Sequence, residues 1–170
     1  MKIALQAINE LQRSGLIRLQ AIGGAIGATF YLEPISTFDL DIFVIFEDAP
    51  LILSLTPIYD FLKSRGHRPE GDAVMIGDWP VQFLPAESPL LREAVEEARE
   101  SDYEEIPIRV MTPEHLMAIA LKTGRAKDFA RLASFVESGV ADATRFDSIL
   151  ARHQLTSNWI LFKSRYLALQ

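Results

Sequence analysis

An apolar run containing two aspartates limits what this chain of 170 residues can fold into. The segment FDLDIFVIF (residues 38–46) is rich in β-branched and aromatic residues, so it predicts a central strand. Side chains alternate between strand faces, which places Asp39 and Asp41 on one face and Leu40 and Ile42 on the other, toward the core. Two ionised carboxylates about 6–7 Å apart at their Cβ atoms repel each other and raise at least one pKa. We therefore expect a compensating positive charge beside this strand.

A divalent cation is the compensating charge that fits two neighbouring carboxylates. Oxygen ligands favour Mg²⁺ or Mn²⁺, which complete their coordination with water and substrate phosphates. Before the Asp-x-Asp strand, Gly23 and Gly24 lie where a short strand (residues 16–22) is expected to lead into a helix. Glycines let backbone N–H groups approach a phosphate, and a helix N-terminus favours its negative charge. These features predict a site for a metal-bound triphosphate, where Ser36 and Thr37 could hydrogen-bond a phosphate or simply cap the loop.

The same residues also fit a plain structural role. Asp-x-Asp tripeptides are common, so the two aspartates could lie on an exposed edge strand after a tight glycine turn. The segment lacks the G-x-G-x-x-G spacing of a Rossmann dinucleotide site. A sugar-nucleotide glycosyltransferase could also use Asp-x-Asp, but roughly 40 residues before the pair are short for the nucleotide-binding half of such folds.

Strands alternate with helices up to about residue 111, and helices follow from Thr112 onward. The pattern predicts helices over 2–14, 25–33, 50–66 and 88–102, and strands over 16–22, 38–46, 73–84 (a hairpin at Gly77-Asp78) and 106–111. Four more helices are expected after Thr112, which offers a Thr cap followed by Pro113. The predicted fold class is therefore α+β, with a sheet core over 1–111 and a helical C-terminal subdomain over 112–170 packed on it.

Composition narrows the class of protein. The formal net charge of −6 does not predict tight nucleic-acid binding by charge alone. No cysteine is present, which excludes disulfides, a thiolate nucleophile and a Cys-type zinc site, and fits a reducing cytoplasm. No apolar run approaches the roughly 20 residues of a membrane span. The N-terminal segment contains Glu10 and Arg13 and is typical of an amphipathic helix rather than a signal peptide. A cytoplasmic protein without membrane contact is expected.

Three motifs together resemble a known superfamily. The stretch GGAIGATFYLEPISTFDLDIFVIF (residues 23–46) resembles the motif of polymerase β-type nucleotidyltransferases, in which a Gly-Gly or Gly-Ser pair precedes an Asp-x-Asp strand. More narrowly, it is similar to small nucleotidyltransferases grouped with the AbiEii toxins of type IV toxin–antitoxin systems. VQFLPAESPLLREAVEEA (81–98) is similar to the third core strand and next helix of the family, and TPEHLMAIALKTGRAKDFARL (112–132) to its helix pair. The resemblance covers roughly residues 18–135.

The resemblance implies a small mixed-sheet nucleotidyltransferase core with helices around it. It implies Mg²⁺-dependent (or Mn²⁺-dependent) transfer of a nucleoside monophosphate from an NTP to a hydroxyl of a tRNA, a protein or a small molecule. A cognate toxin or antitoxin protein would be a further partner. The residue roles that it implies are phosphate binding by Gly23 and Gly24, metal ligation by Asp39 and Asp41, and a basic helical patch near the triphosphate formed by Lys122, Arg125 and Lys127.

Two features leave the functional prediction open. The third carboxylate of the superfamily corresponds to Gln82, a neutral amide that is a poor proton acceptor, and Asp78 is about 13 Å away along an extended chain. Arg125 and Asp128 could be an ordinary i,i+3 ion pair on a helix. The second hypothesis is therefore a catalytically weakened module of the same fold that binds a nucleotide or a partner.

Overall fold

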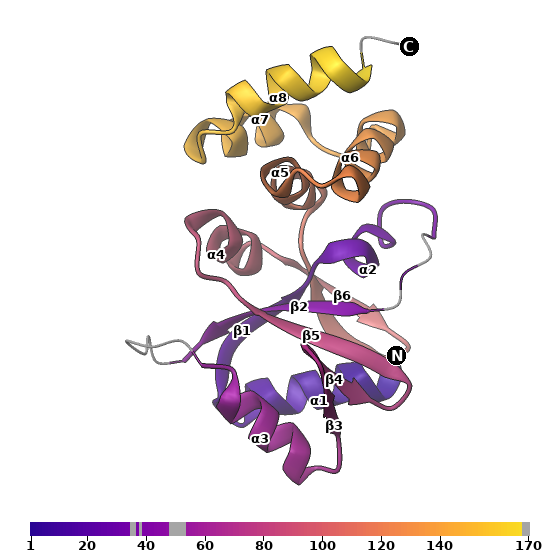
Figure 1. Cartoon of the computed structure of the whole chain (residues 1–170), viewed down its shortest axis with the longest axis vertical. Helices are drawn as coiled ribbons and strands as arrows, with labels where there is room; N and C mark the ends of the chain where they lie inside the picture. The colour runs from indigo at the N-terminus through magenta and orange to yellow at the C-terminus, as the bar shows by residue number, and fades with distance from the viewer. Residues whose placement is uncertain (35–36, 38, 48–53, 168–170) are drawn as a thin grey trace.

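A mixed β-sheet is the centre of the fold (Figure 1). The computed structural model describes residues 1–34, 37, 39–47 and 54–167. In this part of the chain seven strands lie in the order β3-β4-β5-β2-β1-β7-β6. Their bounds are β1 Ile17–Ile22, β2 Leu40–Phe46, β3 Arg68–Glu70, β4 Ala73–Ile76, β5 Trp79–Pro85, β6 Arg99–Tyr103 and β7 Ile106–Val110. The helices are α1 Lys2–Arg13, α2 Gly24–Ala28, α3 Thr56–Ser64, α4 Pro89–Glu96, α5 Pro113–Thr123, α6 Ala126–Ser138, α7 Ala143–Arg152 and α8 Thr156–Phe162, which continues into a π-helical turn, η1 Lys163–Leu167.

Helices cover both faces of the sheet. On one face α1 and α3 bury Leu11 and Leu62 together with Ile42 of β2. On the other face α2 and α4 lie next to the sheet and α5 lies above them, with α6, α7 and α8 farther out (Figure 1). The core of this second layer includes Phe43 of β2 and Leu116 of α5. This arrangement confirms the predicted α+β fold with a mixed sheet and helices in its C-terminal part. The proposed division into units 1–111 and 112–170 stays a prediction.

Strand β2 is central and sets the position of the acidic residues. It pairs antiparallel with β1 and parallel with β5, and in the parallel ladder Asp41 lies beside Gln82 and Phe43 beside Leu84. Leu40 and Ile42 point to the opposite face, where both are fully buried. Asp41 and Phe43 therefore face α2, α4 and α5, as the strand alternation predicts.

Several expected elements differ from those in the structure. The helix predicted over 88–102 ends at Glu96, and Arg99–Tyr103 forms edge strand β6 instead. The turn that joins β6 to β7 has Glu104 and Glu105 at positive φ values of 49° and 66°, a conformation that favours Gly or Asn, so the sequence lacked the usual hairpin signal. The helix expected over 25–33 is confined to Gly24–Ala28.

The hairpin and the cap of α5 form as predicted. The hairpin at Gly77 joins β4 to β5, with Ile76 opposite Trp79. Thr112 caps α5 by accepting a hydrogen bond from the backbone N–H of His115. Within the described ranges, none of the helices combines the length and the apolar character that a bilayer span requires.

Candidate active site

A cleft of about 980 Å³ lies between β2 and β5 of the sheet and helices α5 and α6. The residues that line it come from five separate parts of the chain, and they include most of the predicted site. They are Gly24, Ala25, Thr37, Asp39, Asp41, Phe43, Pro80, Gln82, Leu84, Leu91, Leu116, Ile119, Ala120, Thr123, Arg125, Lys127, Asp128, Ala130, Arg131 and Ser134. The fold thus brings the acidic strand and the basic helix to one concave surface.

The two aspartates of the Asp-x-Asp motif line this cleft together. The hydroxyl of Thr37 donates a hydrogen bond of 3.0 Å to Oδ1 of Asp39. Burial, and next the neighbouring charge of Asp39, raise the pKa of Asp41 to about 6. The charges of Arg131 and Lys127 act in the opposite direction but do not compensate fully. A carboxylate pair with uncompensated negative charge in a polar cleft fits a divalent cation.

Gly24 lies directly against the carboxylate of Asp41. A Cβ atom built on Gly24 would be only 1.8 Å from Oδ2 of Asp41, and the residue has a φ of +57°. Both facts make a side chain at this position costly, because it would strain the backbone and displace the carboxylate. The neighbouring Gly23 donates its backbone N–H to the carbonyl oxygen of Asp41 at 3.0 Å. This N–H is already used, so the structure does not support phosphate binding by the Gly23 amide in this conformation.

Helix α6 and the residue before it place cationic side chains in the same cleft as the aspartates. Asp128, whose side chain is 3% exposed, accepts hydrogen bonds from Nε of Arg125 at 2.6 Å and from its Nη2 at 3.3 Å. Nη1 of Arg131 lies 3.8 Å from Oδ1 of the same carboxylate. Asp128 and Arg131 are three residues apart on α6, and Arg125 directly precedes the helix, so both arginines reach the same carboxylate. The hydrogen bond to Asp128 raises the pKa of Arg125, and the charges of Asp41 and Asp39 add to this effect.

The cation set differs from the predicted one in two respects. Lys122 is exposed on α5 and does not line the cleft. At about 100° per residue its side chain points well away from Thr123 and Ala120, which do line it. Arg131 was missed by the sequence reasoning, although the Arg-x-x-Asp-x-x-Arg spacing from residue 125 to 131 indicates a shared helix face.

Gln82 and Ser36 are the two remaining predicted positions. Gln82 lines the cleft beside Asp41, and its amide makes no hydrogen bond with any residue in the described ranges. It is therefore free to contact a bound molecule as donor or acceptor. Ser36 falls outside the described residues.

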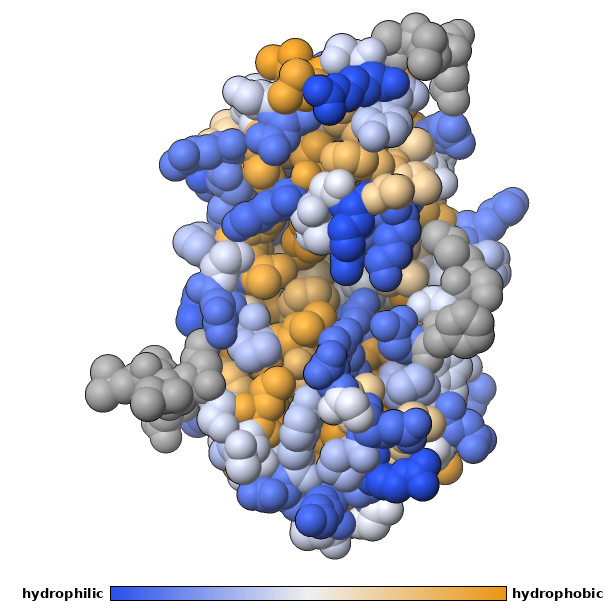
Figure 2. Space-filling view, viewed as in Figure 1, coloured by the Kyte–Doolittle hydropathy of each residue, from blue (hydrophilic) through white to orange (hydrophobic). Residues whose placement is uncertain are grey.

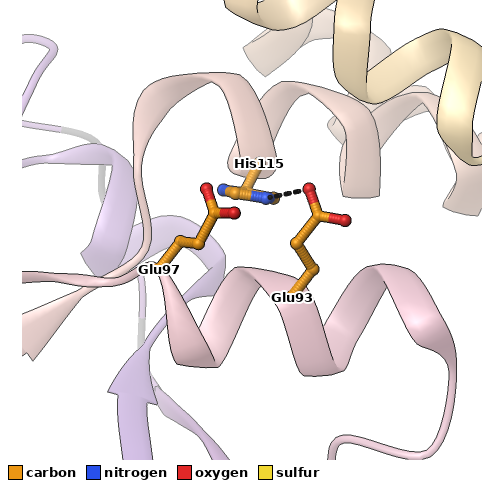
Figure 3. A group of neighbouring side chains, drawn as sticks. All are labelled: Glu93, Glu97 and His115. Atoms are coloured by element: carbon orange, nitrogen blue, oxygen red, sulfur yellow. Dashed lines mark hydrogen bonds and ion pairs between the residues drawn. The ribbon is translucent and has the colours of Figure 1, made fainter.

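A second group of metal-ligand residue types does not line this cleft and is drawn in Figure 3. The ligand atoms of Glu93, Glu97 and His115 lie within 4.8 Å of one another. Nε2 of the fully buried His115 is 3.2 Å from Oε1 of Glu93, and its Nδ1 is 2.9 Å from the Thr112 hydroxyl. Burial lowers the pKa of His115.

This group is better explained as a structural network. Glu93 also accepts hydrogen bonds from His153, at 2.8 Å, and from Arg152, while Glu97 pairs with Arg145 at 2.7 Å. Burial would raise the pKa of Glu93, but these hydrogen bonds outweigh it and hold the pKa at about 2. The network connects α4 to α5 and α7. Since the carboxylates already have cationic partners, we do not assign a metal to it.

The fold is that of known nucleotidyltransferases. The crystal structure of ANT(2'')-Ia in complex with adenylyl-2''-tobramycin aligns with 97% of this chain and 98% of its own, at a TM-score of 0.57 and 17% identity. The solution structure of the antibiotic-resistance factor ANT(2'')-Ia aligns with 99% of this chain and 94% of its own, at a TM-score of 0.52 and 17% identity. The crystal structure of an antigenic nucleotidyltransferase-like protein from Paracoccidioides brasiliensis aligns with 92% of this chain and 89% of its own, at a TM-score of 0.54 and 14% identity. Comparison of the sequence with protein-family models and with curated proteins finds no match.

Proposed function

We propose that this chain is a nucleotidyltransferase that transfers a nucleoside monophosphate from an NTP to a hydroxyl acceptor, with release of pyrophosphate. The observation that supports this most strongly is the meeting of the Asp39–Asp41 pair and the cationic face of α6 across one cleft. A triphosphate with its metal needs both charges at close range. The shared fold with nucleotidyltransferases points the same way.

Each side of the cleft has a distinct role in this proposal. Asp39 and Asp41 would hold Mg²⁺ or Mn²⁺, which when bound would neutralise charge on the transferring phosphate. Arg125, Lys127 and Arg131 would bind the triphosphate oxygens and so orient the α-phosphorus for in-line attack. Gly24 has no Cβ that would displace the carboxylate of Asp41 from its place in the cleft.

A direct transfer assay tests the function. The chain is incubated with each α-labelled NTP, Mg²⁺ and candidate acceptors (tRNA, protein and small alcohols), and labelled products are counted. We expect transfer by the unmodified chain and a loss of about 10²–10³-fold in Asp39→Asn, since one ligand of the metal is removed. Equal labelling by both proteins, or no labelling of any acceptor, would contradict the proposal.

Gln82 supports a second candidate, a module that binds Mg²⁺ and NTP without turnover. The amide leaves no proton acceptor at the position where the superfamily has its third carboxylate. Calorimetric titration with Mg²⁺ and NTP separates the candidates when it is set beside the transfer assay. Tight binding without chemistry favours the module.

The narrower assignment to the AbiEii-like group, with a cognate partner protein and a cytoplasmic location, is supported only by the sequence motifs and the composition. The identity of the adjoining gene is its simplest test. A neighbouring gene for a partner protein would support a toxin–antitoxin role.

Asp128 acts in this proposal as a positioning residue for the two arginines. In Asp128→Asn the side chain loses its charge, so Arg125 and Arg131 are no longer held toward the aspartates. We expect about 10-fold weaker binding of Mg²⁺-NTP and a smaller change for the corresponding NMP, because the arginines are proposed to bind the triphosphate and an NMP lacks its β- and γ-phosphates. Titration calorimetry with both nucleotides measures the two affinities.

The matched control is Asp147→Asn, which makes the same charge change at an exposed position of α7. Equal weakening of NTP and NMP binding by Asp128→Asn, or equal effects of the two variants, would argue for a purely structural Asp128.

A further inference from the structure

The cleft has two unlike halves. One half holds the Asp39–Asp41 pair and the cations of α6. The other half, hereafter the apolar wall, is formed by Phe43, Leu84, Leu91, Leu116, Ile119 and Ala120. Figure 2 shows hydrophobic side chains gathered in the middle of this face of the molecule, with strongly hydrophilic side chains beside them.

The apolar wall begins next to the proposed reaction centre. Phe43 and Leu84 follow Asp41 and Gln82 by two residues on paired strands, so they lie about 7 Å farther along the same face of the sheet. Leu91 extends the wall onto α4. In-line displacement requires the acceptor hydroxyl opposite the leaving pyrophosphate. Since the cations of α6 mark the pyrophosphate side, the acceptor is expected against the apolar wall.

The charges of the lining restrict the acceptor further. The carboxylates among the described lining residues are Asp39, Asp41 and Asp128. The first two are assigned to the metal, and Asp128 is already paired with Arg125 and Arg131. None of these three is left to bind an ammonium group. An acceptor with several amino groups would therefore lack partners on this wall.

The neutral Gln82 adds a chemical restriction. A carboxylate at this position could remove the proton of an alkyl alcohol, but an amide cannot. A phenolic hydroxyl, with a pKa of about 10 as in tyrosine, loses its proton to water far more easily than an alkyl alcohol does. The Gln82 amide can then donate an N–H to the phenolate oxygen.

On these grounds, and resting on the proposed function, we propose that the acceptor is an uncharged phenol whose ring lies on the apolar wall. The phenolic proton passes to solvent water. The phenolate oxygen attacks the α-phosphorus and forms a new P–O bond. The bond from the α-phosphorus to the bridging oxygen of the β-phosphate breaks, and pyrophosphate leaves with its electron pair. The product is an aryl ester of the nucleoside monophosphate.

A pair of isomeric probes tests the acceptor class. p-Cresol and benzyl alcohol have the same atoms and similar apolar surface, but only p-cresol is a phenol. With α-labelled NTP and Mg²⁺, p-cresol is expected to be labelled at least 10-fold faster than benzyl alcohol or the aminoglycoside tobramycin. N-acetyl-tyrosinamide, in the same assay, distinguishes a tyrosine side chain from a small free phenol as the source. Equal or faster labelling of benzyl alcohol or tobramycin overturns the proposal.

Leu91→Glu tests the wall, because it places a carboxylate where the ring is expected. We expect at least a 10-fold loss in kcat/KM for p-cresol with an unchanged Kd for Mg²⁺-NTP. Leu91→Gln, which is neutral, should lower kcat/KM for p-cresol by a smaller factor. Leu161→Glu, at an exposed leucine of α8 outside the cleft, should leave kcat/KM unchanged. A Kd for NTP that weakens in step with acceptor use would show that the wall holds the nucleobase and would overturn the proposal.

Binding measured without chemistry separates this proposal from the proposed function. The chain is loaded with Mg²⁺ and α,β-methylene-ATP, whose α-phosphorus cannot release pyrophosphate, and p-cresol binding is followed by saturation-transfer NMR. Binding of p-cresol that Leu91→Glu removes supports a phenol site on the apolar wall, and if no transfer is then found it is the transferase function that fails. No binding of p-cresol to the loaded chain overturns the acceptor proposal.

Discussion

The Asp41→Asn variant is expected to be more stable than the unmodified chain in the absence of metal, although it should lose transferase activity. The folded-state pKa of Asp41 is raised to about 6 from 3.8, so its ionisation opposes folding. The penalty is small below about pH 4, grows between about pH 4 and about pH 6, and is complete above about pH 7. A shift of roughly two pKa units corresponds to at most about 3 kcal/mol. The amide removes this penalty together with the metal ligand.

Urea unfolding in EDTA at about pH 8 and at about pH 4 measures the effect. The variant should gain stability only at the higher pH. Asp78→Asn, at an exposed position in the β4–β5 turn, makes the same charge change and should leave the free energy of unfolding unchanged at both pH values. In the transfer assay the rate of nucleotidyl transfer by Asp41→Asn should be about 10²–10³-fold lower than that of the unmodified chain. Equal stability of variant and unmodified chain at the higher pH would show that the carboxylate is not strained by burial.

Gly24→Ala, which adds a single methyl group, is expected to displace the carboxylate of Asp41 and so to weaken metal-dependent nucleotide binding. Its Cβ would lie 1.8 Å from Oδ2 and 2.7 Å from Cγ of Asp41, so the carboxylate must move. The φ of +57° adds strain of about 1–2 kcal/mol for a residue with a Cβ. We expect Mg²⁺-dependent NTP binding to weaken at least about 10-fold, since the two metal ligands no longer keep their spacing. Calorimetry with and without Mg²⁺ measures the change.

Gly71→Ala is the matched control for backbone strain. Gly71 has a φ of +59°, nearly that of Gly24, but a Cβ built there meets nothing within 4 Å. Both variants should lose stability from the positive φ, and only Gly24→Ala should also lose metal-dependent binding. If the two variants bind Mg²⁺-NTP equally well, the contact between Gly24 and Asp41 has no role in the site.

Local patterns predicted the buried strands well and the exposed edge poorly. The run from Leu40 to Phe46 is apolar enough to be central, and alternation fixes which face Asp41 occupies. Strand β6 has the sequence RESDY, which is mostly exposed and has no period-2 apolar pattern. Its pairing with β7 depends on backbone hydrogen bonds, which side-chain patterns do not predict. The charged sequence therefore led us to expect a helix there.

The candidate site shows the same limit. Asp39 and Asp41 could be related in the sequence because they belong to one recognisable strand, and Gln82 was added to them only through the family resemblance. Arg131 and Asp128 face them only because α6 crosses over the cleft, and no local pattern specifies that crossing. The contacts of Glu93 with residues 22 and 60 positions away are equally invisible to sequence periodicity.

The Glu93 network has a consequence for how acid treatment of this protein should be interpreted. Its carboxylate, with a pKa of about 2, remains ionised throughout the range in which Asp41 takes up a proton. The contacts of α4 with α5 and α7 therefore keep their anionic partner while Asp41 in the cleft becomes neutral. Mildly acidic solution should neutralise Asp41 without separating the helices, so a loss of Mg²⁺-NTP binding near pH 6 would report local protonation of that carboxylate and not unfolding.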